Sequence, residues 1–344
     1  MVLEKILVLM SFVINSIIKG RFVGRTLFGF IGLACILSTP LIGETKVHND
    51  TMLLTVDKTK LEAVLQTWPE DRSGAKVLKK FRIATGKEEG DKQKEGDNRT
   101  PEGVYFAQMH INGSKLPAKY GSMAIPIDFP NPIDRVEKKT GYGIWLHGVD
   151  NAKRIEEAKV TEGCVAFYNE DVAKLGAWLK PRQGLVVIAD ELASVNRPEE
   201  VSEVKRLTQS WIDAWANRSI NDYIGHYHKS FRYKGQDLPT YTSYKRNVFS
   251  GYKKMVVSYD HLRVVTHPKY AVSMFNQDFY GDKRFKSLGR KILYWIKDAD
   301  GNWKIRREIF ENRRFEFLTY TDKELAMLNG RSFSEGSQRS ASKL

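Results

Sequence analysis

The hydrophobic period of the chain changes near residue 200. Residues 51–190 contain short apolar or alternating runs of the kind that form β-strands. Val204, Leu207, Trp211 and Trp215 then repeat at helical spacing, and long strand-like runs follow them. A single arrangement of strands and helices does not account for the patterns of both halves of the chain. The change therefore predicts a mostly-β first domain and a second, α+β domain with a curved antiparallel sheet packed on helices.

The length of 344 residues fits two domains with additional terminal segments. The loop at 86–100 is charged and Gly-rich without an apolar residue, which predicts a solvated loop. In the second half, strands are expected at 256–266, 270–280, 289–297 and 303–310. The expected segments are a signal peptide or N-terminal anchor at 1–43, a first domain at 51–190, a linker at 191–203, a second domain at 204–328 and a disordered tail at 329–344.

The N-terminus has the pattern of an export signal. Two apolar stretches, Ile6–Ile18 and Thr26–Ile42, are separated by Lys19, Arg21 and Arg25. Two interpretations remain open: a cleaved signal peptide, or an uncleaved anchor that associates with the inner membrane. Either one predicts an exported protein of the periplasm or cell envelope.

The net charge and the number of cysteines exclude some classes of protein and of binding site. The formal charge is +14, and residues 201–344 hold 27 basic against 15 acidic residues, which predicts attraction to a polyanion. Cys35 and Cys164 are too few for a disulfide framework or a multi-cysteine zinc site. We expect no metal and no cofactor. Nucleic-acid binding is not expected, because the chain begins with an export-type segment and contains no recognition motif. The sequence leaves open whether the protein forms a homodimer.

Residues 143–148, Gly-Ile-Trp-Leu-His-Gly, alternate as a strand would. Trp145 and His147 then share one face, directed at a cleft, while the other face fills the core. Cys164 lies seventeen residues after His147, at the start of an apolar strand. An imidazole that takes the thiol proton would make Cys164 a nucleophile, and Gly163 would let the backbone approach a substrate. The alternative is that Cys164 is a small buried hydrophobe and His147 a satisfied polar residue.

Five separated elements resemble, in this order, the YkuD-type L,D-transpeptidase domain over about residues 51–190. They are Ala84-Thr85-Gly86, Arg99–Gly103, Ile144–Gly148, Thr161–Cys164 and Asn169–Asp171. The resemblance implies that Cys164 is the acylating nucleophile, His147 the base and the Gly148 carbonyl the group that orients the imidazole. The implied substrates are peptidoglycan stem peptides. The candidate substrate- or oxyanion-binding residues are Gly163, Thr161, Trp145 and Tyr120.

Two departures from the family pattern affect substrate binding. Thr161 stands where the family commonly has Ser, and Ala166 where it has Arg. Thr keeps the hydroxyl, but Ala removes a guanidinium that would bind a carboxylate.

The stretch from Tyr120-Gly121 through Pro126–Pro132 to Gly141–Gly148 resembles the branch that contains cell-shape L,D-carboxypeptidases, in which an NTF2-like (SnoaL-like) domain follows the catalytic one. Trp211–Trp215 and the paired runs around Trp295 and Trp303 resemble such a domain. The expected function is an L,D-carboxypeptidase that removes terminal D-Ala from tetrapeptides through an acyl-enzyme resolved by water. The alternative is an L,D-transpeptidase, in which an amine resolves the same intermediate. An inactive wall-binding scaffold is the third hypothesis.

Overall fold

A computed structural model of the chain describes residues 47–70, 75–282 and 285–329. The expected targeting segment, Cys35 and all but the first residue of the expected tail lie outside these ranges. The described residues belong to one compact unit. Within them, every helix is too short or too polar to cross a bilayer.

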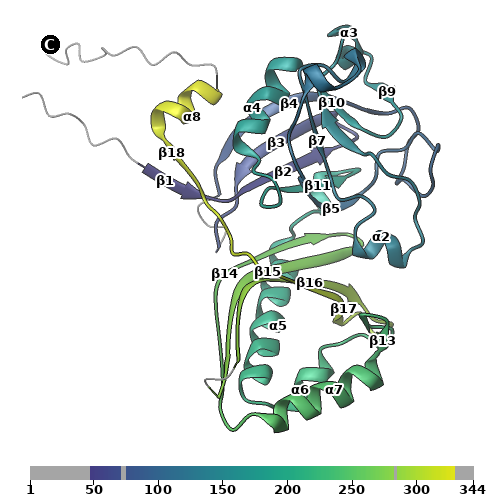
Figure 1. Cartoon of the computed structure of the whole chain (residues 1–344). Coiled ribbons are helices and arrows are strands. Elements are labelled where there is room, and N and C mark those ends of the chain that lie inside the picture. Colours follow the sequence, from purple (N-terminus) through teal and green to yellow (C-terminus); the bar gives the residue numbers. More distant parts are fainter. Residues whose placement is uncertain (1–46, 71–74, 283–284, 330–344) are drawn as a thin grey trace, which may run out of the picture. The chain divides into compact units, whose positions relative to one another are not determined.

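The first domain is built on a ten-stranded mixed sheet (Figure 1). Its order is β5-β11-β2-β3-β4-β10-β8-β7-β6, with β9 paired to β4. Three pairs are parallel, namely β11 with β2, β10 with β8, and β4 with β9. The strands are β2 (Met52–Asp57), β3 (Glu62–Thr67), β4 (Val77–Gly86), β5 (Gly103–Phe106), β6 (Ile111–Asn112), β7 (Met123–Pro126), β8 (Trp145–His147), β9 (Lys159–Thr161), β10 (Val165–Phe167) and β11 (Leu185–Ala189).

Short helices join these strands. Helix α4 begins after Tyr168 with Glu170 and Asp171 in its first turn, and it buries Val172 and Leu175 in the domain core. Helix α2 begins with a capping box between Asn131 and Asp134. The helices are α2 (Pro132–Val136), α3 (Lys153–Glu156), α4 (Asn169–Trp178) and the 3₁₀ turns η1 (Gly113–Lys115), η2 (Ala118–Tyr120) and η3 (Leu192–Ser194).

The second domain has the predicted α+β architecture. Four antiparallel strands in the order β14-β15-β16-β17 form one sheet, and α5, α6 and α7 share a core with it (Figure 1). The elements are α5 (Pro198–Ala216), α6 (Ile220–Gly225), β12 (Arg232–Tyr233), β13 (Gln236–Asp237), α7 (Leu238–Gly251), β14 (Met255–His267), β15 (Tyr270–Gly281), β16 (Phe285–Lys297) and β17 (Trp303–Glu311). The expected strands thus form at the expected places, each slightly longer than predicted.

A hydrophobic core also joins the two domains. Strand β2 is buried on both faces: Leu54 and its neighbours at alternate positions enter the core of the first domain, whereas Leu53 packs with the second. Val265 and Val272 of the second sheet lie in the same cluster as Leu53. The largely apolar sequence of β2 therefore has a structural reason, since neither face meets water.

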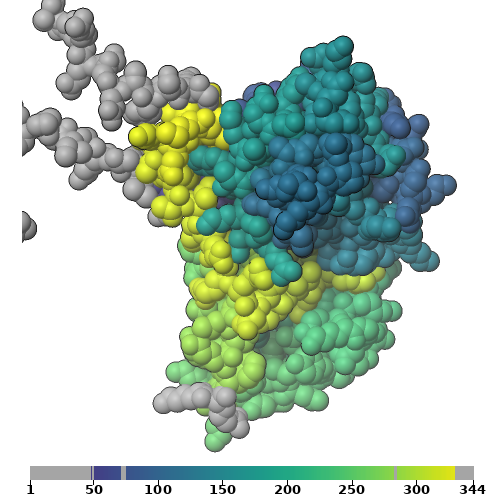
Figure 2. Space-filling model, turned by 45° about the horizontal axis from the view of Figure 1, so that its top comes forward, coloured from purple at the N-terminus to yellow at the C-terminus, as the bar shows by residue number. Residues whose placement is uncertain are grey.

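The C-terminal segment crosses back to the first domain. Strand β18 (Leu318–Thr321) pairs antiparallel with β1 (Val47–Asp50), and α8 (Asp322–Leu328) follows. Tyr320 and Leu328 are buried in the core of the first domain, and Tyr320 packs edge-on against Trp178. Figure 2 shows this yellow segment against the teal surface of the first domain. The structure thus differs from the expected second-domain end at 328, because these apolar side chains complete the other core.

Two smaller expectations also differ. Helix α5 begins at Pro198, so the second half of the expected linker 191–203 is helical. The 86–100 segment is irregular as predicted, but it is not fully solvated. Lys92 is 3% exposed and its ammonium lies 2.7 Å from Asp97, and Thr100 is fully buried. Opposite charges within the segment neutralise each other, which makes the burial of its charged residues tolerable.

Candidate active site

Two adjacent parallel strands bring His147 and Cys164 together. His147 ends β8, and Ala166 of β10 is its partner in the register. Cys164 immediately precedes β10, where its Sγ accepts a hydrogen bond from the backbone nitrogen of Trp145 at 3.4 Å. The thiol donates toward the Gly143 carbonyl at 3.6 Å. As predicted, Ile144 and Leu146 fill the core on the opposite face.

His147 and Cys164 line one cavity of about 180 Å³. This cavity, called the cysteine cavity below, is open to solvent on one side, while both reactive side chains are nearly buried. Its lining residues are Lys87, Lys119, Tyr120, His147, Arg154, Val160, Thr161, Glu162 and Cys164.

A backbone carbonyl determines the tautomer of His147. Nδ1 lies 2.5 Å from the carbonyl oxygen of Gly148. A carbonyl oxygen only accepts, so Nδ1 carries the hydrogen and donates it. In the neutral ring Nε2 is then the acceptor, the form that a general base requires.

Burial keeps both reactive groups neutral. It is the largest influence on the pKa of His147, which falls to about 4, with Arg154 and Lys119 acting in the same direction and the bond to Gly148 opposing them. Burial also raises the pKa of the Cys164 thiol to about 11, although the hydrogen bond from Trp145 favours the thiolate. At pH 7 the cavity thus holds a neutral thiol and an unprotonated imidazole, the two groups that transfer of the thiol proton to a base requires.

The turn before Cys164 is closed by Thr161. Its hydroxyl donates to the Cys164 carbonyl at 2.7 Å and accepts from the Gly163 nitrogen at 3.1 Å. Gly163 has φ +123°, and a Cβ there would lie 2.6 Å from the Arg99 carbonyl oxygen. The position therefore requires glycine.

Asn169 fixes the loop that carries the Gly148 carbonyl. Its side-chain oxygen accepts from the nitrogens of Ser122 and Val149, and its nitrogen donates to the Val149 carbonyl at 2.8 Å. A Cβ on Gly148 would lie 2.1 Å from the Asn169 oxygen. Asn169 thus positions the acceptor of the His147 hydrogen bond, a role that the sequence did not assign to it.

Family models match both halves of the chain. Residues 53–188 match the YkuD L,D-transpeptidase catalytic domain, and residues 203–309 match the Cds6 C-terminal NTF2-like domain. The chain joins a YkuD domain to an NTF2-like domain. This confirms the two domain families and their expected order.

Two solved structures share the arrangement of both domains. Bd1075 of Bdellovibrio bacteriovorus is 28% identical, with a TM-score of 0.65 over 76% of this chain and 92% of that protein. The helical cell shape determining protein Pgp2 of Campylobacter jejuni is 23% identical, with a TM-score of 0.62 over 77% of this chain and 93% of that protein. A search of curated proteins gives no match.

Tyr120 and Trp145 form an aromatic wall of the YkuD domain. The Tyr120 ring stands edge-on to His147, with centroids 5.1 Å apart, and contacts the Trp145 ring at 4.8 Å. Tyr120 lines the cysteine cavity, whereas Trp145 supports it from behind and contributes its backbone nitrogen to Cys164. Of the remaining predicted site residues, Thr161 lines the cavity, and Gly148 and Gly163 act through their backbones.

Cations not expected from the sequence surround the cavity. Ala166 is fully buried in a small apolar cluster, so that position offers no charge to a substrate. Lys87, Lys119 and Arg154 line the cavity instead. Arg154 is held by Asp150 at 3.1 Å and by the Lys119 carbonyl at 3.2 Å. Short-range sequence pattern gives no signal for these residues, because they come from three separate segments: the loop after β4, the 3₁₀ turn η2 and the short helix α3.

Within residues 47–70, 75–282 and 285–329, no group of three or more His, Cys, Asp or Glu side chains lies close enough together to hold a metal ion. His226 and His228, beside α6, are engaged with the Asp222 carbonyl and the Ser230 hydroxyl respectively.

Proposed function

We propose that the chain is an L,D-carboxypeptidase of peptidoglycan stem peptides, with Cys164 as nucleophile and His147 as base. The observation that carries the proposal is the shared cysteine cavity, in which a neutral thiol and a neutral imidazole of fixed tautomer lie under a cationic rim. The match to the YkuD L,D-transpeptidase model supports the reaction class.

The proposed reaction has two halves. The thiol proton passes to His147 Nε2 as Sγ attacks the carbonyl carbon before the terminal D-Ala. The C–N bond then breaks, and His147 returns the proton to the leaving amine. Water attacks the thioester in the second half, giving up a proton to His147, and the freed thiolate recovers it. The products are D-Ala and a stem tripeptide.

Backbone groups beside the sulfur are suited to the developing oxyanion. The Cys164 nitrogen or its neighbour would donate to it, at a turn that Thr161 holds rigid. Lys119 and Arg154 would bind the D-Ala carboxylate, the task left open by Ala166.

The second candidate is an L,D-transpeptidase, favoured by the description of the matching family. The acyl-enzyme would be the same, but an amine of another stem would replace water. The third is a scaffold in which Cys164 has no chemical role.

Intact-mass spectrometry of the protein with a stem tetrapeptide tests these candidates, with Cys164→Ala as control. Release of D-Ala that depends on Cys164 supports the enzyme, and tripeptide as the main product supports hydrolysis. Accumulation of 3-3 cross-linked dimers would replace hydrolysis with transpeptidation. A folded, reduced protein that releases no D-Ala and forms no adduct would leave the scaffold.

The substrate would place the protein in the cell envelope, with the 1–43 segment directing its export. A role in cell shape is proposed by extension, because the Pgp2 structure is described as that of a helical cell shape determining protein.

A further inference from the structure

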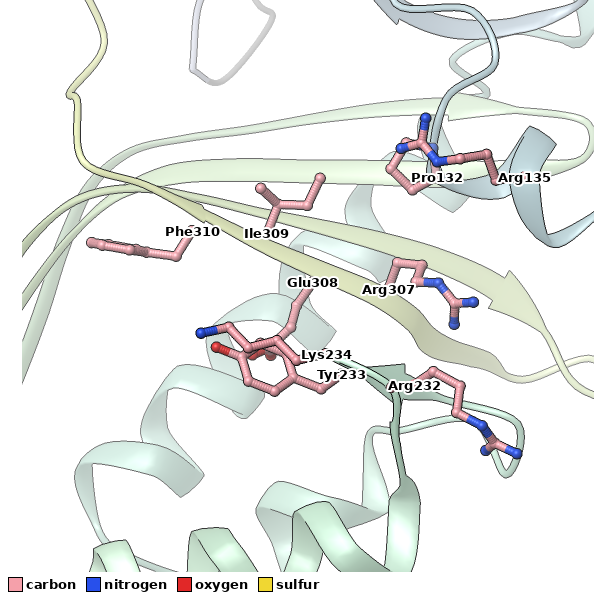
Figure 3. Close-up of a pocket in the computed structure, with 10 residues that line it drawn as sticks. Pro132, Arg135, Arg232, Tyr233, Lys234, Arg307, Glu308, Ile309 and Phe310 are labelled. Carbon is pink, nitrogen blue, oxygen red and sulfur yellow. The ribbon is translucent and has the colours of Figure 1, made fainter.

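A second cavity, of about 650 Å³, lies away from the cysteine cavity (Figure 3). Helix α2 of the YkuD domain forms one side, and the β12–β13 hairpin and strand β17 of the NTF2-like domain form the others. It shares no lining residue with the cysteine cavity. Its lining residues are Pro132, Arg135, Arg232, Tyr233, Lys234, Gly235, Arg307, Glu308, Ile309 and Phe310.

Four cations line this cavity, which we call the arginine cavity. Figure 3 shows Arg307 between Arg135 on α2 and Arg232 on β12. Lys234 follows at the hairpin turn, where it and Gly235 both have positive φ, and its ammonium lies 5.6 Å from the Tyr233 ring. Two domains thus place positive charge around one space.

Among the described residues, none of these three guanidinium groups forms an ion pair with a carboxylate, although Asp237 and Asp128 attract Arg232 and Arg135 at longer range. The side chains of Arg135, Arg232 and Arg307 donate to the backbone carbonyls of Pro130, Phe231 and Arg306. Other arginines of the same protein do pair with acids, as listed here: Arg154 with Asp150, Arg197 with Glu200, Arg290 with Glu311, and Arg314 with Asp260 and Asp278. The lack of pairing in the arginine cavity is therefore a local property.

Two carboxylates of the NTF2-like domain lie close to the cations of the arginine cavity. Glu308 lines the cavity, but its carboxylate accepts from the hydroxyls of Tyr227 and Tyr241 and faces Lys291. Its side chain is 3% exposed. Asp237 stands opposite Arg232 in the hairpin, where it caps α7 through the Thr240 nitrogen. Both carboxylates thus serve other partners.

The cations repel one another. The pKa of Arg307 falls to about 10, with burial as the largest cause and the charges of Arg306, Arg232 and Arg135 acting in the same direction. Such a cluster costs stability unless an anion neutralises it. The arrangement is consequently better explained by a ligand than by folding.

We propose that the arginine cavity binds the oxyanion groups, carboxylate or phosphate, of an anionic ligand. Guanidinium forks bind both groups with paired hydrogen bonds, and three arginines from separate elements line the cavity. The cavity is large enough for a ligand with more than one oxyanion. The proposal does not depend on the chemistry at Cys164.

The test measures binding to the full chain carrying Cys164→Ala, so that no turnover occurs. Two probes distinguish the sources of the oxyanion: inorganic pyrophosphate, and a stem tripeptide with free carboxylates. Calorimetric titration at low and at moderate salt gives the affinity and its salt dependence. Arg232→Gln and Arg307→Gln are the test variants. Arg206→Gln on the exposed face of α5 is the control, since it removes the same charge elsewhere.

We expect at least one probe to bind, more weakly at higher salt, and each test variant to weaken it by about 10-fold while the control does not. Binding of pyrophosphate alone assigns the site to phosphate, and binding of the tripeptide alone assigns it to carboxylate; either supports the proposal. The absence of binding by both probes overturns it, as does equal weakening by all three variants. Should Arg307→Gln not fold, Arg232→Gln on the exposed hairpin decides the result.

Discussion

The hydroxyl of Thr161 donates a hydrogen bond to the carbonyl oxygen of Cys164, 2.7 Å away. The hydroxyl oxygen of Thr161 also accepts a hydrogen bond from the Gly163 nitrogen, so one side chain closes the turn that presents the nucleophile. The methyl group that distinguishes Thr from Ser leaves both bonds intact. The substitution within the family pattern thus preserves the turn.

Replacing Thr161 tests this role. Thr161→Val keeps the shape of the side chain but removes both hydrogen bonds, and we expect kcat to fall by about 10-fold or more because the sulfur and the backbone donors lose their fixed geometry. Thr161→Ser should restore at least half of the activity. Steady-state D-Ala release measures both, with circular dichroism as the check on folding. Equal activity of the Val and Ser variants would contradict the role.

The pH dependence of the reaction should follow the buried His147. The base must be unprotonated, and its pKa of about 4 keeps it so until the pH falls through that value. We therefore expect kcat/KM to remain level from about pH 8 to 5 and to decline near pH 4. An acid limb centred near 6.5, the value of a solvated imidazole, would show that the free site is open to water. The profile of D-Ala release in a constant-ionic-strength buffer decides this.

Arg154 should act on substrate affinity. Arg154→Gln removes a cation from the cysteine cavity, and we expect KM to rise by about 10-fold with kcat changed by less than about 3-fold. Because Arg154 also lowers the pKa of His147, the acid limb should move toward higher pH. Lys153→Gln is the control, since this exposed neighbour does not line the cavity. An unchanged KM in this variant would show that Arg154 does not bind the substrate carboxylate.

Tyr270 should contribute to the stability of both domains together. Its hydroxyl accepts from the Val104 nitrogen and from the Asn131 side chain, each at 2.6 Å. Tyr270→Phe leaves both donors buried without this partner, so we expect the free energy of unfolding to fall by about 1–3 kcal/mol. Tyr280→Phe, at an exposed position of the same strand, should change it by less than about 0.5 kcal/mol. Urea unfolding followed in both variants measures the difference, and similar losses would contradict the interdomain role.

Local sequence pattern predicted the strands beside His147 and Cys164 better than it predicted the other residues that line their cavity. Alternation placed His147 and Trp145 on one face of β8, and the apolar run after Cys164 identified β10. The pairing of β8 with β10, which brings the two residues together, is non-local, so the sequence supported it only through the family resemblance. Lys119 and Arg154 were not predicted for the same reason. Single charges in elements of three or four residues carry no periodicity that would reveal a shared cavity.

In the fold as well, local features were predicted from the sequence and long-range contacts were not. Strands β14 to β17 were predicted because each is long and apolar, whereas the six-residue strand β3 was not identified. The segment from Leu318 to Leu328 was assigned to the nearer domain in sequence, although its apolar side chains fill the core of the other. Burial in a distant core leaves no trace in a short window of sequence.

The pairing of β1 with β18 makes the first domain dependent on a segment that is synthesised after the NTF2-like domain. During translation β1 leaves the ribosome before the NTF2-like domain. Its partner strand β18, which carries Tyr320, leaves the ribosome only after that domain. A nascent chain therefore carries an unfinished YkuD domain until β18 and α8 have emerged. A premature stop after residue 317 would leave the sheet and helices of the NTF2-like domain complete but would remove part of the core of the domain that carries Cys164.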